Sequence, residues 1–196
     1  MSRSRFDQSD FFAAALAIAA EHGPSAATVA SITERLKAPV GSFYYRFGSR
    51  DLLLGELWLQ TVLAFQEGVG AALDAGDGLG AALHTPAWAR AHLNEARLLL
   101  LYDREDFGQS GWPAPLRDGV MAQARQIEAH VARFAGLVFG REGPGEQRRA
   151  QFLLAEVPVA AVRQHLRRRE PPPPLVDGLI RTTYFAVVTD YRRDNS

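Results

Sequence analysis

The segment at residues 28–47, TVASITERLKAPVGSFYYRF, reads as two short helices joined by a tight turn. Its first half begins with Thr28, a residue type that is favoured as a helix N-cap. Val29, Ile32 and Leu36 follow at the i, i+3, i+7 spacing that places apolar side chains on one helix face. This half therefore predicts a short amphipathic helix with one buried side.

The second half of the segment predicts another short helix after a turn at residues 37–39. The proline of this turn lacks an amide hydrogen and disfavours helical geometry in the residue before it. Phe43 and Phe47 lie four residues apart and so share one face, with Arg46 and Arg50 nearby. Two helices in this arrangement fit the helix-turn-helix of DNA-binding proteins, and an ordinary helical hairpin stays open as the alternative.

Residues 41–53, GSFYYRFGSRDLL, resemble the Gly-Thr-Leu-Tyr-x-His-Phe-x-Ser-Lys-Glu-x-Leu signature of the tetracycline-repressor (TetR) family of bacterial transcription regulators. The likeness extends over about residues 8–58. Lys37 stands where the family usually has glycine, and Ala38-Pro39 stands where it usually has Val-Ser. The remainder of the chain matches the family only in its length and helical character.

The resemblance implies a set of DNA-binding residues in the second helix and its flanks. Tyrosine hydroxyls and arginines suit phosphate oxygens, while small residues permit a close approach to base edges. The positions that meet bases or nearby backbone are Thr28, Val40, Gly41, Ser42 and Tyr45, and the phosphate-contacting positions are Tyr44, Arg46 and Arg50. The helical period also places Val40 near Phe43 and Phe47, so it could pack inward instead.

The composition limits what kind of nucleic-acid binder this chain can be. Its 196 residues carry no net charge, with a pI near 7.0, so any DNA contact must come from a local patch. Residues 1–50 hold six basic and four acidic side chains, a balance of +2. The lack of cysteine excludes disulfides, cysteine-ligated zinc and thiol catalysis. With no signal peptide and no stretch of ~18 to 20 apolar residues, we expect a cytoplasmic protein without a membrane segment.

Apolar periodicity without any strand pattern predicts an all-α fold of about nine helices. We expect an N-terminal three-helix, helix-turn-helix DNA-binding domain at residues 1–48. A larger C-terminal helical domain for effector binding and dimerisation is expected at residues 49–196. The first domain is too small to be comfortably stable by itself.

The helices of the larger domain are predicted from caps and breakers. The helix that starts after Ser49 should weaken at Gly68 and Gly70. Thr85 and Pro86 form a credible N-cap and N1 pair for the next helix. The helices that follow Ser49 are expected near residues 50–67, 85–92, 94–106, 115–139, 146–169 and 176–191, the fifth with a kink at Pro158.

The last two helices carry a long apolar stripe. The TetR resemblance implies that they pair with their copies in a second subunit as a four-helix bundle, and a palindromic DNA site requires such a two-fold dimer. The predicted interface residues are Phe152, Val159, Val162, Val176, Leu179, Ile180, Thr183, Tyr184, Val187 and Val188. Burial of the same stripe within one chain stays open as the alternative.

The middle helices are rich in aromatic side chains with a few polar groups among them. Such a lining fits a mostly apolar cavity that holds a small organic molecule. The candidate effector-binding residues are Trp58, Phe65, Trp88, His92, Tyr102, Phe107, Met121, His130 and Phe134. The alternative is that they belong to the core, which for any single one of them is the more common role.

Catalysis, a metal site or a cofactor has no supporting pattern in the sequence. The five histidines lack HExxH or comparable spacing, and no glycine-rich phosphate loop follows a strand. The hypothesis is a homodimeric repressor that binds a palindromic, double-stranded DNA operator and is released by a small, largely apolar effector. Two alternatives remain: a regulator of the same fold that acts through a protein partner, and an all-α enzyme or metal-binding protein.

Overall fold

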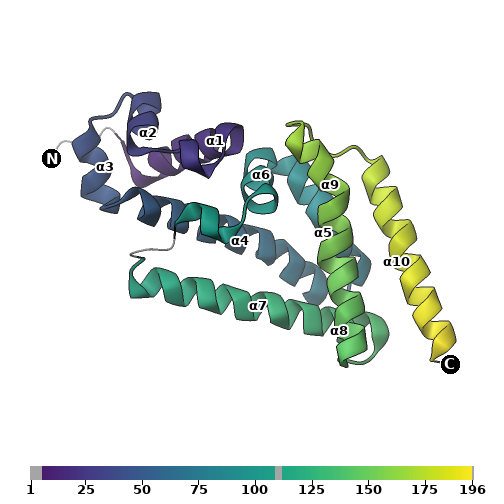
Figure 1. The fold of residues 1–196 in the computed structure, drawn as a ribbon. Helices are drawn as coiled ribbons and strands as arrows, with labels where there is room; N and C mark the ends of the chain where they lie inside the picture. Colours follow the sequence, from purple (N-terminus) through teal and green to yellow (C-terminus); the bar gives the residue numbers. More distant parts are fainter. Residues whose placement is uncertain (1–5, 109–111, 196) are drawn as a thin grey trace. The chain divides into compact units, whose positions relative to one another are not determined.

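The structure is a computed structural model that describes residues 6–108 and 112–195, and every regular element in these ranges is helical (Figure 1). The all-α class predicted from the sequence is therefore confirmed. The α-helices are α1 Gln8–His22, α2 Val29–Leu36, α3 Val40–Phe47, α4 Arg50–Asp74, α5 Gly78–Ala91, α6 Leu93–Leu101, α7 Ala114–Phe139, α8 Pro144–Gln151, α9 Val157–Arg167 and α10 Leu175–Asp194.

Three short elements complete the described fold. They are the 3-10 helices η1 Pro24–Ala26 and η2 Arg104–Phe107 and the π-helical turn η3 Phe152–Glu156. Because η3 joins α8 to α9 without a break, the described chain has the expected nine helices when residues 144–167 are counted as one. The π turn ends just before Pro158, the residue predicted to disturb this helix, since proline leaves a carbonyl of the preceding turn without its donor.

Helix starts in the N-terminal region are set by side-chain caps. Asp7 and Asp10 form a reciprocal capping box at α1. Thr28 and Ser31 form a second one at α2, which confirms Thr28 as the N-cap. The Ser49 hydroxyl accepts a hydrogen bond of 3.1 Å from the amide of Leu52 and so caps α4.

The turn between α2 and α3 is built around Lys37. Its backbone lies in the left-handed region, with φ 54° and ψ 39°, where the family usually has glycine. The amides of Lys37 and Ala38 donate to the carbonyls of Glu34 and Thr33, which closes the end of α2. Pro39 is then the N-cap of α3. The turn forms with lysine at a conformational cost of roughly 1–2 kcal/mol.

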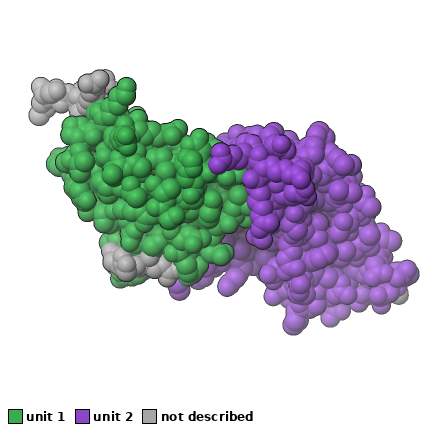
Figure 2. Space-filling model, turned by 45° about the horizontal axis from the view of Figure 1, so that its top comes forward, with its two compact units in different colours: residues 1–62, 94–120 green, residues 63–93, 121–196 purple. Residues whose placement is uncertain are grey.

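The described chain divides into two compact units (Figure 2). Unit 1 consists of residues 1–62 and 94–120, and unit 2 of residues 63–93 and 121–196. This division by contacts differs from the expected domains 1–48 and 49–196, because the first part of α4, α6 from Asn94 onward and the start of α7 belong to the same unit as the helix-turn-helix. The functional division after residue 48 stays a prediction.

The core of unit 1 is aromatic at its centre. Phe11 of α1 meets Phe43 and Phe47 of α3 edge-on, with ring centroids 5.9 and 5.8 Å apart. Leu98 of α6 and Phe107 of η2 are fully buried in the same cluster. These two residues lie 51 and 60 positions beyond the end of α3 in the sequence, so the small three-helix head acquires its core from a distant part of the chain.

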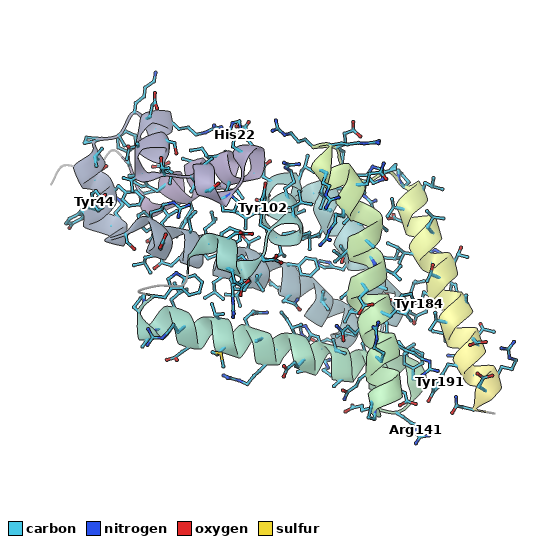
Figure 3. All side chains as sticks on the ribbon, in the orientation of Figure 1. His22, Tyr44, Tyr102, Arg141, Tyr184 and Tyr191 are labelled. Atoms are coloured by element: carbon cyan, nitrogen blue, oxygen red, sulfur yellow. The ribbon has the colours of Figure 1, made fainter. Side chains whose placement is uncertain are left out.

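A buried arginine joins α6 to α1 within unit 1. Arg97 is almost fully buried, and its Nε donates a hydrogen bond of 2.8 Å to the carbonyl of Ala20 in the last turn of α1. This carbonyl is one of those that a helix end leaves without an intrahelical donor. Tyr102, which follows α6, lies against Gly23 at the end of α1 (Figure 3).

Unit 2 corrects two of the predicted helix bounds. α5 begins at Gly78, with Asp77 as its N-cap, and Pro86 lies inside the helix; the predicted start at Thr85 is therefore wrong. Asp77 accepts a hydrogen bond of 2.7 Å from the amide of Gly80, and the packing of α5 against α9 and α10 outweighs the cost of the internal proline. α4 continues through Gly68 to Asp74.

We expect Leu98→Ala to lower the free energy of unfolding of unit 1 by about 2–5 kcal/mol, because the lost side chain leaves a cavity beneath α1 and α3. Urea unfolding followed by tryptophan fluorescence measures the change, since Trp58 and Trp112 both lie in unit 1. Leu63→Ala, at a half-exposed leucine, serves as the control and should change stability by less than about 0.5 kcal/mol. Equal losses in the two variants would contradict a core completed by α6.

Candidate DNA-binding surface and effector site

The buried face of α3 fixes the orientation of this helix. Phe43 and Phe47 are buried against Phe11, and Ile32 of α2 belongs to the same cluster. Edge-on aromatic contacts of this kind restrict both the roll of the helix and its distance from α1. The opposite face of α3 is thereby held outward.

The exposed face of α3 carries most of the predicted DNA-binding residues. Tyr45 is 88% exposed, while Val40 and Tyr44 are about half exposed. Val40 therefore points outward, which resolves the ambiguity of its helical position. A side-chain carbon added at Gly41 would meet no atom within 4 Å, so this position offers open space for a close approach. Figure 3 shows Tyr44 on α3.

Two of the predicted contact residues use their hydroxyls locally. Thr28 is exposed, and its Oγ1 accepts a hydrogen bond of 3.1 Å from the amide of Ser31 in the capping box. Ser42 donates a hydrogen bond of 2.6 Å to the carbonyl of Pro39. Both residues therefore help to define the ends of the helices that flank the turn.

The two arginines predicted to bind phosphates are engaged within the protein. Arg46 donates a hydrogen bond of 2.8 Å to the carbonyl of Ser42 and a second hydrogen bond to the carbonyl of Phe6. Its guanidinium carbon also lies 5.5 Å from the centre of the Phe11 ring. A phosphate would have to compete with these contacts. Sequence reasoning missed them because the carbonyl acceptors come from backbone that no side-chain pattern reveals.

Arg50 connects the start of α4 to the segment before α2. Its guanidinium donates to the carbonyls of Ala27 and Pro24 at 2.9 and 2.7 Å and to Asp51 at 3.0 Å. These bonds account for three of its donors and give it a structural role. Its predicted phosphate contact stays a prediction, and exposed Lys37 in the turn is a further cation on this surface.

The predicted effector residues are divided between the two units. Trp58, Tyr102 and Phe107 belong to unit 1, where Phe107 is buried in the aromatic core. The remaining six, all in unit 2, are Phe65, Trp88, His92, Met121, His130 and Phe134. Met121 is 57% exposed. The effector pocket as a whole stays a prediction.

His130, in α7, has both ring nitrogens engaged. Its Nδ1 lies 2.8 Å from the Gln66 Oε1, and its Nε2 lies 2.9 Å from the Gln126 amide nitrogen. Burial lowers the pKa of His130, and nearby Arg133 lowers it further, which favours the neutral ring. The neutral tautomer with its proton on Nδ1 satisfies both bonds, and His130 therefore links α4 to α7 within unit 2.

Half of the ten predicted dimer-interface residues are buried inside unit 2. Val162, Val176, Ile180, Tyr184 and Val188 are buried, and Tyr184 lies edge-on to Phe134 at 6.3 Å. Figure 3 shows Tyr184 and Tyr191 on α10. Val159, Thr183 and Val187 are partly exposed, while Leu179 and Phe152 are exposed.

Among its exposed large apolar residues, the outward face of α10 shares only Leu179 with the predicted interface. Its exposed large apolar residues are Leu175, Leu179 and Phe185. The periodicity in the sequence detected the inward stripe because that stripe contains more β-branched and aromatic residues. A bidentate salt bridge between Arg90 and Asp177, with N–O distances of 2.8 and 3.0 Å, fixes the start of α10.

Further observations concern membranes and metals. Of the helices that the structure describes, none is long and apolar enough to cross a membrane. Within residues 6–108 and 112–195, no group of three or more histidine, aspartate or glutamate side chains is placed to hold a metal ion.

Comparisons with known proteins agree with the helix-turn-helix geometry. Residues 11–57 match the family model described as bacterial regulatory proteins, tetR family. A protein from Shewanella sp. PV-4 that is assigned to the tetR family of transcription regulators has a similar fold, with 19% identity and a TM-score of 0.65. The match covers 94% of this chain and 96% of that one. The search of curated proteins finds no match.

The exposed α3, held by its aromatic core, and the matched region together define an all-α transcription regulator of the helix-turn-helix class. The resemblance drawn from the sequence is confirmed for the N-terminal region, because residues 11–57 match the tetR family of bacterial regulatory proteins.

We expect Arg50→Gln to lower the free energy of unfolding by about 1–3 kcal/mol, because it removes the guanidinium bond to the carbonyl of Ala27 and one of the two bonds to the carbonyl of Pro24, which keeps the amide of Ala27 as a donor. Arg50→Lys should recover only part of the loss, since one ammonium cannot reproduce the planar array of donors. Thermal and urea unfolding measure both variants. Unchanged stability in Arg50→Gln would argue that the guanidinium is available for phosphate.

Proposed function

We propose that this protein is a repressor that binds a palindromic double-stranded DNA operator as a homodimer, through the outward face of α3. The observation that carries the proposal is the two-sided character of α3. Phe43 and Phe47 hold one side in the core, while Val40, Tyr44 and Tyr45 extend from the other. A helix fixed in this way presents a constant set of side chains to the major groove.

Dimerisation is a requirement of this proposal because a single head carries few cations. The protein has no net charge, and Arg46 and Arg50 are both bonded internally. Binding through two heads in successive major grooves, ~34–36 Å apart, makes the second contact effectively intramolecular. Weak individual heads then give useful affinity together.

The outward face of α10 supplies the proposed dimer surface. Leu175, Leu179 and Phe185 are four and six residues apart and are all exposed on this helix. Exposed Phe152 lies in an open hollow that Val187 and the charged side chains of Arg148, Arg149 and Asp190 also line. Pairing of this face with its copy would remove these apolar side chains from water.

Effector control is the remaining part of the proposal. The N-terminal part of α4 belongs to unit 1 and the C-terminal part to unit 2, so one continuous helix contributes to both. A small, largely apolar molecule that binds unit 2 in one conformation would lower DNA affinity, and DNA would lower ligand affinity by the same factor. Residues 1–48 then form the DNA-binding part and residues 49–196 the effector-binding and dimerising part of a cytoplasmic regulator.

We expect Tyr45→Ala to abolish sequence-selective binding while leaving stability unchanged, because Tyr45 is 88% exposed and supports no core contact. Footprinting and gel-shift titration on the DNA upstream of the coding sequence, at moderate salt, measure the effect. Arg125→Ala, an exposed change on α7, is the control and should bind as the wild type does.

Two results would count against the repressor. If the wild type and Tyr45→Ala bind DNA equally and without sequence selectivity, the proposed operator binding is contradicted. If the wild type shows no selective DNA binding but retains a specific protein from a lysate, the result would favour a regulator that acts through a protein partner.

We expect Phe185→Asp to convert the protein into a monomer and to weaken operator binding at least tenfold, because a carboxylate on each copy would face the other. Light scattering coupled to gel filtration gives the mass. The matched control is Met121→Asp, since Met121 is 57% exposed and Phe185 is 52% exposed in the same unit. A dimer that survives Phe185→Asp but dissociates in Met121→Asp would move the interface to α7.

A further inference from the structure

Two glycines of α4 provide room for two histidines of unit 2. A Cβ added at Gly68 would overlap the imidazole of His84, which comes from α5. A Cβ added at Gly70 would lie 3.3 Å from the Nε2 of His130, which comes from α7. Each ring therefore lies directly against the α4 backbone, and the same helix receives a histidine from either neighbour.

The two rings differ in how their nitrogens are used. Both nitrogens of His130 have side-chain partners. The His84 Nε2 is buried and has no hydrogen-bond partner among the described residues. In the neutral tautomer with its proton on Nδ1, the Nε2 presents an unused lone pair.

The surroundings of His84 are aromatic. Its ring lies 5.0 Å from that of Phe65, which in turn meets Trp88 edge-on at 5.1 Å. Burial lowers the pKa of His84, in accord with a neutral ring. Buried nitrogens without a partner are rare in folded proteins, and each one requires an explanation.

A second unused group lies in the same unit. The side chain of Gln123 is 4% exposed, and its amide nitrogen has no partner among the described residues. Gln123 precedes His130 by seven residues on α7, so the two lie along one helix face. Unit 2 thus contains one buried acceptor and one buried donor, both unpaired.

We propose that His84 is the polar anchor of the effector site, where its Nε2 accepts a hydrogen bond from a hydroxyl or N–H of an uncharged aromatic molecule. Gln123 donates to an oxygen of the same ligand. This assignment rests on the effector control proposed above and names its ligand class. A neutral ligand fits because the aromatic surroundings offer no counter-charge to an ion. His84, which the sequence analysis did not select, replaces His130 as the polar group of the site.

The test compares 2-naphthol with 2-methoxynaphthalene, which differ in the hydrogen-bond donor, by calorimetry on the full chain without DNA. The wild type should bind 2-naphthol about tenfold more tightly, in line with one hydrogen bond to a buried acceptor. In His84→Phe the two affinities should become equal. Gln123→Met should weaken both probes by a similar factor, since both carry the oxygen that Gln123 would meet.

The matched control is His22→Phe, at an exposed histidine of unit 1, which should keep the tenfold preference. Gly68→Ala provides a second way to displace the imidazole if His84→Phe does not fold, and it should also remove the preference. Equal binding of both probes by the wild type, a preference that survives in His84→Phe, or no binding of either probe would each overturn the proposal. The assay contains no DNA, so its result does not depend on whether the protein binds an operator.

Discussion

The burial of Phe11 against Phe43 and Phe47 is the contact on which the DNA-binding surface depends. It determines which side of α3 faces outward, and it is complete only when Leu98 and Phe107 fill the same cluster. A head of this size has too little interior to exclude water by itself. The region that recognises DNA is therefore the exposed part of a larger unit, and changes in α6 or η2 reach it through shared core atoms.

Charge has an unexpected distribution around this surface. Arg46 and Arg50 donate hydrogen bonds to backbone carbonyls in and around the helix-turn-helix, so positions expected to bind phosphate also maintain the fold. An alanine substitution at either position would therefore mix two effects. Tyr45 and Val40 separate them, because both are exposed and neither supports the core. Specificity is best studied at these residues.

Much of the N-terminal fold was predictable because its signals are local. Thr28 as a cap, Pro39 at the turn and the four-residue spacing of Phe43 and Phe47 each act within one or two helical turns. Pro86 misled the prediction because the tertiary packing of α5 outweighs its local preference. The roles of Arg50 and His84 were not predictable, since each depends on atoms that meet only in the folded chain.

The dimer surface illustrates a limit of periodicity. The pattern in α10 correctly identifies an amphipathic helix, but two apolar stripes exist, and sequence alone cannot assign one to the subunit interior and the other to a partner. Ile180 and Val188 turned out to be buried within the chain, while Leu179 and Phe185 are exposed.

Gly68 and Gly70 also affect the local stability of the α4 backbone. Each glycine lowers the intrinsic helix propensity by roughly 1 kcal/mol relative to alanine. The C-terminal half of α4 therefore relies on side chains from α5 and α7 to remain helical. Whatever changes the positions of those rings changes the local stability of the α4 backbone, and amide hydrogen exchange along this segment would register it without any displacement of the helix.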